Sequence, residues 1–173
     1  MNFLVKITAV IITLTITSCA TITSDIEVHT HVHADTDLNA YKTYAWAGSA
    51  QIVFDPIGQW EQPTLDTDEE VRFVINRELR ARSINQVDLD PDLLVAFAAG
   101  VDATSLELTE HPDNEEDVLS TLPKAALVIA LVDADTGYVV WMGYASGEVQ
   151  QQQSIETIRA RIDYAVSKIF NQL

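Results

Sequence analysis

Apolar and polar residues recur with regular periods along this chain, and these periods predict its elements. Residues 26–34 alternate between the two kinds, which is typical of a half-buried strand. Residues 42–47 predict a second strand with aromatic side chains on one face, and residues 48–63, which contain two prolines, predict a loop. Residues 92–99 are almost all apolar, so we expect a strand near the centre of a sheet.

Two later segments have the period of an amphipathic helix. Thr67 and Glu70 fit a capping box that opens the first helix, and the second helix follows the polar residues 150–153. The apolar stripe of the first helix consists of Val71, Val74, Ile75 and Leu79. The stripe of the second helix consists of Ile155, Ile158, Ile162, Val166 and Ile169. Each stripe requires a surface to cover.

The segment between the two helices contains the remaining strands. Residues 124–132 and 138–147 predict the two strands of a hairpin, which the turn at 133–137 connects. Residues 101–122 are acidic and variable in pattern, and we expect one edge strand in them near 104–108. The order of elements predicts an α+β fold, with a mostly antiparallel sheet and the two amphipathic helices packed on one of its faces.

The first 18 residues have the layout of a secretory signal peptide. Lys6 supplies a positive charge, and residues 7–16 are apolar apart from threonines. This apolar run is too short to span a bilayer, which requires about 20 residues. We therefore expect a signal peptide at residues 1–18, a tether at 19–25 and a single domain at 26–173.

Residues 16–20, Ile-Thr-Ser-Cys-Ala, resemble the lipobox of bacterial lipoproteins. The resemblance implies a diacylglyceryl group on Cys19, cleavage after Ser18 and acylation of the new amino terminus. Cys19 is the only cysteine and cannot form an internal disulfide; the alternative is an ordinary signal peptide with an incidental cysteine. Ala20 stands after the cysteine in place of aspartate, and by resemblance to the known sorting rules of enterobacteria this implies the outer membrane, with the domain facing the periplasm.

The charge of the mature chain restricts its partners. The whole chain has a formal net charge of -16, and loss of Lys6 with the signal peptide gives -16 - 1 = -17. Nucleic acid is a poor partner for so acidic a protein, because like charges repel. The partners we expect are the membrane, through lipid on Cys19, and an envelope protein or polymer.

Three histidines form the first candidate site. His29, His31 and His33 alternate along the first strand and share one face with Glu27 and Asp35. Zinc accepts imidazole nitrogen, so this face is a candidate metal or small-ligand site. The alternative is an exposed polar face of a strand.

Other motifs have simpler explanations. Asp135-Thr136-Gly137 is the triplet of aspartic proteases, but that chemistry requires two facing aspartates, and a hairpin turn explains the single copy. Acid clusters at 66–70, 88–92 and 113–117 lack the spacing of an EF-hand loop, and helix starts, strand starts and solvated loops explain them. The tryptophans and tyrosines are expected mainly in the core, with a binding surface as the alternative. The aromatic residues concerned are Trp46, Trp60, Trp141, Tyr41, Tyr44, Tyr138 and Tyr144.

Three blocks of the sequence carry a family resemblance. They are Asp-Leu-Asn-Ala-Tyr-Lys-Thr-Tyr-Ala-Trp at 37–46, Asp-Pro-Asp-Leu-Leu-Val at 90–95, and the hairpin at 131–145 with its Val-Trp-Met-Gly. Together with the lipobox they resemble the bacterial lipoproteins grouped as domain of unknown function 4136. Met142 stands where such proteins usually carry arginine. The resemblance implies an envelope lipoprotein with no assigned activity. The anchor and a compact domain without catalytic groups lead us to expect a non-enzymatic binding or structural module without a cofactor. Its expected contact surface is Trp60 with the loop at 48–63.

Overall fold

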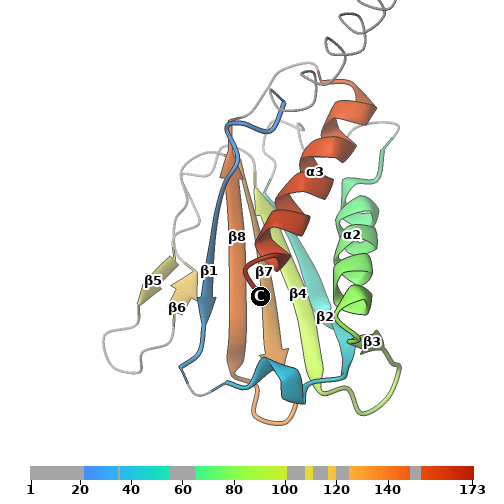
Figure 1. The fold of residues 1–173 in the computed structure, drawn as a ribbon, viewed down its shortest axis with the longest axis vertical. Coiled ribbons are helices and arrows are strands. Elements are labelled where there is room, and N and C mark those ends of the chain that lie inside the picture. The colour runs from blue at the N-terminus through green and yellow to red at the C-terminus, as the bar shows by residue number, and fades with distance from the viewer. Residues whose placement is uncertain are drawn as a thin grey trace, which may run out of the picture.

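Six strands form one sheet, and two helices cover one of its faces (Figure 1). This computed structural model describes residues 22–34, 36–54, 65–100, 108–110, 117–119, 125–148 and 153–173. The strand order is β1-β8-β7-β4-β2-β3. The strands of this sheet are β1 Glu27–Val32, β2 Thr43–Phe54, β3 Asn85–Gln86, β4 Leu93–Gly100, β7 Ala125–Asp133 and β8 Val139–Gly147. The helices are η1 Leu38–Ala40, α2 Thr67–Ala81 and α3 Ile155–Phe170.

The sheet is mixed, which corrects the prediction of a mostly antiparallel one. The pairs β1–β8, β8–β7 and β7–β4 are antiparallel, whereas β4–β2 and β2–β3 are parallel. The parallel pairs arise because α2 follows β2 and returns the chain to the end of the sheet where β2 began. A helical period between two strands is the usual sign of such a crossover, and it is present in the sequence between residues 47 and 92.

Both helices form where the apolar period predicts them. All four stripe residues of α2 are buried, and in α3 the buried set includes Ile162, Val166 and Ile169. The first cap differs by one residue from the prediction. The N-cap is Asp66, whose carboxylate accepts the amide of Glu69 at 2.9 Å, and Thr67 lies inside the helix. Asp66 and Glu69 have the same spacing as Thr67 and Glu70, so the pattern fits both positions.

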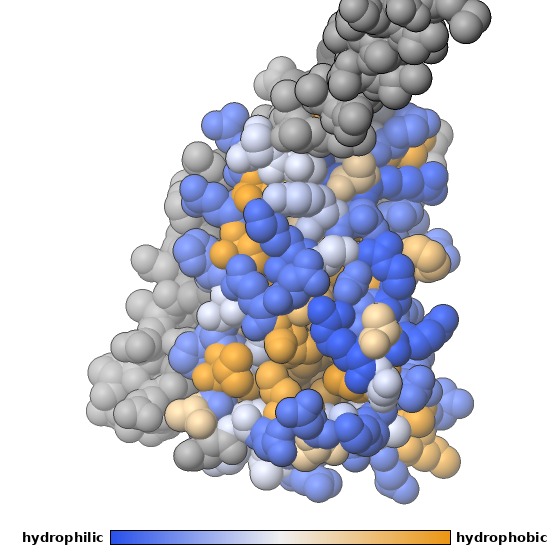
Figure 2. All heavy atoms as spheres, viewed as in Figure 1, coloured by the Kyte–Doolittle hydropathy of each residue, from blue (hydrophilic) through white to orange (hydrophobic). Residues whose placement is uncertain are grey.

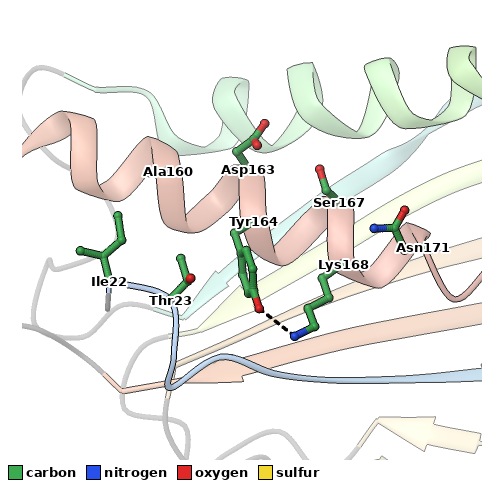
Figure 3. A pocket seen from close by; sticks show the side chains of 8 residues that line it. All are labelled: Ile22, Thr23, Ala160, Asp163, Tyr164, Ser167, Lys168 and Asn171. Carbon is green, nitrogen blue, oxygen red and sulfur yellow. Dashed lines mark hydrogen bonds between the residues drawn. The ribbon is translucent and has the colours of Figure 1, made fainter. Parts of the chain in front are cut away.

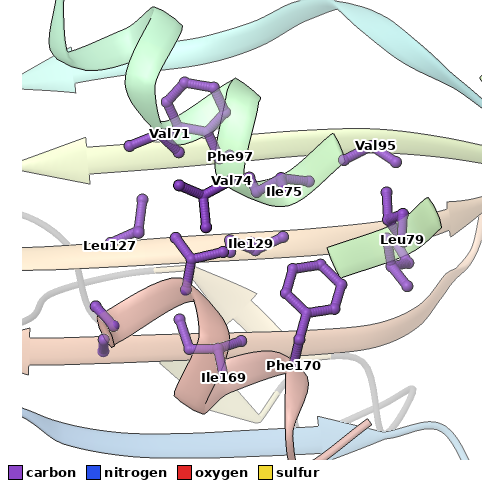
Figure 4. Packing of buried hydrophobic residues seen from close by; sticks show 14 of the residues in the cluster. Val71, Val74, Ile75, Leu79, Val95, Phe97, Leu127, Ile129, Ile169 and Phe170 are labelled. Carbon is purple, nitrogen blue, oxygen red and sulfur yellow. The ribbon is translucent and has the colours of Figure 1, made fainter. Parts of the chain in front are cut away.

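The core lies between the helices and the sheet (Figure 4). Val74 and Ile75 of α2 and Ile169 of α3 are at most 1% exposed, as is Ile129 of β7. Gly143 of β8 lies under α3, where an added Cβ would overlap Ile169 Cγ2. The helix therefore packs closely on the sheet at a position of β8 that has no side chain.

The predicted loop at 48–63 is wrong in its first part, because β2 continues to Phe54. A register shift between Trp46 and Gln51 separates its two paired halves, which hides the strand period. Residues 55–64 lie outside the described part. The edge strand predicted near 104–108 is partly matched by β5 Leu108–Glu110, which pairs with β6 Asp117–Leu119 in a separate small sheet.

Hydrophilic residues prevail on the outer surface of the helices, with smaller hydrophobic areas between them (Figure 2). Over the described ranges, no helix has the length and hydrophobicity that crossing a bilayer requires.

Candidate binding groove beside the N-terminal tether

One arginine of α3 holds the chain that precedes β1. Arg161 donates from Nη1 to Asp25 Oδ1 and from Nη2 to Asp25 Oδ2, both at 2.7 Å. Its Nη1 also donates to the carbonyl of Ile22, and its Nη2 donates to the carbonyl of Glu148 at 3.2 Å. The amide of Glu148 donates to Asp25 Oδ2 at 2.7 Å. We call these four residues, Ile22, Asp25, Glu148 and Arg161, the tether clasp.

The tether clasp is largely withdrawn from solvent. The side chains of Arg161 and Asp25 are 12% and 16% exposed. The hydrogen bond from Arg161 lowers the pKa of Asp25 from 3.8 to about 2, although burial acts in the opposite direction. A Cβ on Gly147 would lie 3.0 Å from Arg161 Nη2 and 3.1 Å from Asp25 Oδ2. The clasp is thus a bidentate, charge-assisted pair in a closely packed setting, which is stronger than a typical surface ion pair.

A groove of about 510 Å³ runs beside the clasp along the outer surface of α3. Figure 3 shows Tyr164 and Lys168 on the side of the N-terminal segment, while Asp163 and Ser167 point toward α2. The segment 22–23 forms one rim of the groove, and α3 forms the other. The lining residues are Ile22, Thr23, Ala160, Asp163, Tyr164, Ser167, Lys168 and Asn171.

The lining of the groove contains several hydrogen-bond donors, and its one carboxylate among the described residues is paired with an arginine. Lys168 Nζ donates to Tyr164 Oη at 2.7 Å and lies 5.0 Å from the centre of the Tyr164 ring, so its partner is neutral. The carboxylate of Asp163 accepts from Arg77 Nη1 at 2.5 Å, which compensates its charge. The groove therefore has one ammonium group, several hydroxyls and an amide along a wall with apolar sections.

Hydrogen bonds under the groove hold α3 against α2. Ser167 Oγ donates to Glu78 Oε1 at 3.0 Å, and Arg77 Nη2 donates to Ser167 Oγ at 2.8 Å. Burial acts to raise the pKa of Glu78, but hydrogen bonds from Arg77, Arg82 and Ser167 outweigh it and lower the pKa overall. These charges belong to the interface between the helices, and their role is to position the groove wall.

Comparison with known proteins identifies the family of this chain and solved structures with a similar fold. A family defined as a domain of unknown function, DUF4136, matches residues 28–173. The chain belongs to this family. A DUF4136 family protein from Bacteroides thetaiotaomicron has a similar solved structure, with a TM-score of 0.61 and 15% identity over 86% of this chain and 95% of that one. This likeness extends to the fold alone.

Two further solved structures are more distant from this DUF4136 chain. A PelC dodecamer from Paraburkholderia phytofirmans has a TM-score of 0.48 and 11% identity, over 85% of this chain and 98% of that one. A minor lipoprotein from Acinetobacter baumannii has a TM-score of 0.35 and 13% identity, over 77% of this chain and 92% of that one. No curated protein matches the sequence.

Several positions that the sequence singles out fall outside the described residues of this DUF4136 protein. They are Cys19, Asp35, Trp60, His111 and the acid cluster at 113–116. Residues 22–25, which the sequence analysis assigns to the tether, are fixed to α3 by the clasp. The chain is therefore held to the domain closer to Cys19 than the pattern predicts.

The histidine strand has the predicted alternation. His29 and His31 are exposed on β1 and pair in register with Tyr144 and Met142 of β8. The His29 ring stacks on Tyr144 with centroids 5.0 Å apart. Within the described part of the chain, no three His, Cys, Asp or Glu side chains come together closely enough to hold a metal ion. Side chains two residues apart on a strand are separated by roughly 6.6 Å, which explains why alternation alone does not assemble a site.

The remaining motifs have structural roles. Asp133 Oδ1 accepts the amides of Asp135 and Thr136 at 3.1 and 2.7 Å, and Gly137 has φ +76°, so the Asp-Thr-Gly triplet is a hairpin turn as predicted. Asp66 caps α2, as described above. Asp92 accepts the amides of Lys42 and Thr43, both at 2.8 Å, and joins the starts of β2 and β4.

The aromatic residues divide between core and surface. Trp141 and Tyr44 are 0% and 2% exposed, so they belong to the core, whereas Tyr138 is 61% exposed. Arg72 of α2 lies over the Trp46 ring at 4.4 Å from its centre. Sequence reasoning did not find the clasp or the groove. Asp25 and Arg161 are 136 residues apart, and an acid and a base at that separation give no local signal.

Proposed function

We propose that this protein is a lipid-anchored bacterial envelope protein of the outer membrane, which faces the periplasm and binds an envelope partner in the groove along α3. The observation that carries the proposal is the tether clasp, because it fixes residue 22 at the rim of the groove. Cys19 precedes Ile22 by three residues, and a fully extended segment of that length spans at most about 11 Å. The groove is therefore close to the proposed lipid anchor.

The chemistry of the groove favours binding over catalysis, and we propose that the domain is not an enzyme. Hydrolysis by carboxylates requires two of them, facing the same substrate and differing in pKa. Asp163 is the one carboxylate among the described lining residues, and Arg77 already holds it. Hydroxyl, amide and ammonium groups beside apolar sections suit an extended partner with its own hydrogen-bonding groups, such as a peptide segment of an envelope protein.

Site-specific photo-crosslinking in intact cells tests this proposal. A photoreactive residue at Lys168 lies in the groove, whereas the same residue at Glu156 lies on the same helix and outside it. We expect a defined adduct from position 168, identified by mass spectrometry, and none from position 156. The absence of an adduct at 168, or the same adducts at both positions, would contradict binding in the groove.

A further inference from the structure

The tether clasp has a consequence for how the domain sits on a membrane. We infer that the clasp fixes the orientation of the domain, so that the end of the sheet with Gly147 faces the bilayer and the β7–β8 turn points away from it. The inference rests on the proposed lipid anchor at Cys19. The lipid bilayer is thus the partner of the clasp-bearing end.

The length of free chain decides whether orientation is possible. With the clasp closed, three residues separate Cys19 from Ile22, and this leash reaches at most about 11 Å. With the clasp open, the first residue held by the sheet is Glu27 of β1. The leash then has eight residues and reaches about 28 Å. The shorter leash is well below the length of the domain, which restricts tumbling, whereas the longer leash is comparable to it.

The positions of the strand ends determine which end of the domain faces the bilayer. The clasp lies at the end where β8 finishes at Gly147 and where β1 begins, since Glu27 pairs with Ser146. The turn at Asp135 connects β7 to β8 at the other end. Eight residue steps along β8 separate the two ends by about 27 Å. A bilayer at the clasp-bearing end therefore leaves the turn farthest from the surface (Figure 1).

Hydrogen bonds and close packing together hold the clasp in place. Arg161 donates to both oxygens of Asp25 and to two backbone carbonyls from segments on either side, those of Ile22 and Glu148. Thr23 and Ile26, on either side of Asp25, are each 8% exposed, and the amide of Ile26 donates to the carbonyl of Thr23 at 3.1 Å. Buried side chains on both sides of Asp25 thus hold this segment to the domain, together with the hydrogen bonds of Arg161.

Energy transfer on vesicles tests the orientation. Cys19 is the only cysteine and would carry lipid, so a cysteine introduced at Glu156 or at Asp135 is a unique site for a donor dye. The lipidated protein is placed in phosphatidylcholine vesicles that contain an acceptor-labelled lipid, since a neutral surface does not repel an acidic protein. We expect transfer from position 156 to exceed transfer from position 135 at least twofold.

Asp25→Asn removes the charge of the clasp, and we expect it to reduce this difference by more than half. The matched control is Glu70→Gln, which removes the charge of another ion pair of α3, that of Glu70 with Arg159, and changes neither a clasp residue nor a residue that lines the groove. The control should keep the wild-type difference. Equal transfer from both positions in the wild type, or an unchanged difference in Asp25→Asn, would overturn the inference.

Failure of the anchor is distinguishable from failure of the clasp. A chain that does not stay with the vesicles contradicts the proposed lipidation. In that case hydrogen exchange on the Cys19→Ala protein still tests the clasp. We expect the Ile26 and Glu148 amides to exchange at least tenfold faster in Asp25→Asn, with β4 and β7 unchanged. Exchange at those two amides that does not change would overturn the clasp itself.

Discussion

Gly143 of β8 and Ile169 of α3 meet where the helix crosses the sheet. A Cβ added to Gly143 would overlap Ile169 Cγ2 and would lie 2.9 Å from Cη2 of Trp141. Both neighbours are fully buried, so neither has space into which to move. The close approach of α3 to the sheet at this point, and with it the position of the groove on the other side of α3, depends on this glycine.

The first prediction concerns this contact. Gly143→Ala should lower the free energy of unfolding by about 1–3 kcal/mol, because the added methyl group overpacks the core. Urea denaturation measures the change. Gly137→Asn is the control, since Gly137 has φ +76° with no atom within 4 Å of an added Cβ, and asparagine tolerates this conformation. A Gly143→Ala protein as stable as the control would show that α3 does not pack here as described.

The second prediction is a pH dependence of the clasp. The pKa of Asp25 is lowered from 3.8 to about 2, mainly by the Arg161 hydrogen bond. The stabilisation is therefore complete above pH 4 and is lost as the pH falls through about 2. It amounts to about 2 kcal/mol at neutral pH. Denaturation experiments at pH 7 should show a free energy of unfolding that is lower by about 2 kcal/mol in Asp25→Asn than in the wild type. Below pH 4 we expect this difference in free energy to shrink. A difference that does not depend on pH would contradict the assignment.

The third prediction concerns Tyr41. Its hydroxyl donates to Asp133 Oδ2 at 2.9 Å, and burial, together with this hydrogen bond, raises the pKa of Tyr41 from 10 to about 12. The neutral phenol is thus favoured by folding, and its stabilisation is full below pH 10 and lost as the pH rises through about 12. The difference in phenolate absorbance between the wild type and Tyr41→Phe reports on Tyr41 alone. We expect this difference to appear only as the pH nears 12. Its appearance near 10 would mean that Tyr41 does not bind Asp133.

The fourth prediction concerns the junction between β2 and β4. Asp92→Ala removes the carboxylate that accepts the amides of Lys42 and Thr43, and because water reaches this contact we expect the free energy of unfolding to fall by about 1 kcal/mol. Asp88→Ala, an exposed substitution in the same acid cluster, is the matched control and should change stability little. Equal effects of the two substitutions in thermal unfolding would remove the special role of Asp92.

Local periodicity was sufficient for the elements whose burial is simple. The stripes of α2 and α3 predict the buried face of each helix, because one side of α2 and the C-terminal half of α3 pack against the sheet. The hairpin β7–β8 and its turn were predicted from apolar runs on both sides of turn residues. The family could also be predicted from three blocks of sequence, and the match of the DUF4136 family to residues 28–173 confirms it.

Long-range pairing could not be predicted in the same way. The mixed sheet depends on which strands become neighbours after the α2 crossover, and the apolar pattern of β2 is interrupted by the register shift after Trp46. The candidate site was missed because Asp25 and the residues of α3 come from opposite ends of the chain. Each has an ordinary local context, and only the folded sheet brings them together.

The intact mass of the mature protein from membranes, beside that of a Cys19→Ala variant, tests the central claim most directly. The account predicts a mass that fits residues 19–173 plus acyl chains, and loss of this modification together with membrane association in the variant. An unmodified chain that is released without detergent would contradict a lipid-anchored envelope protein.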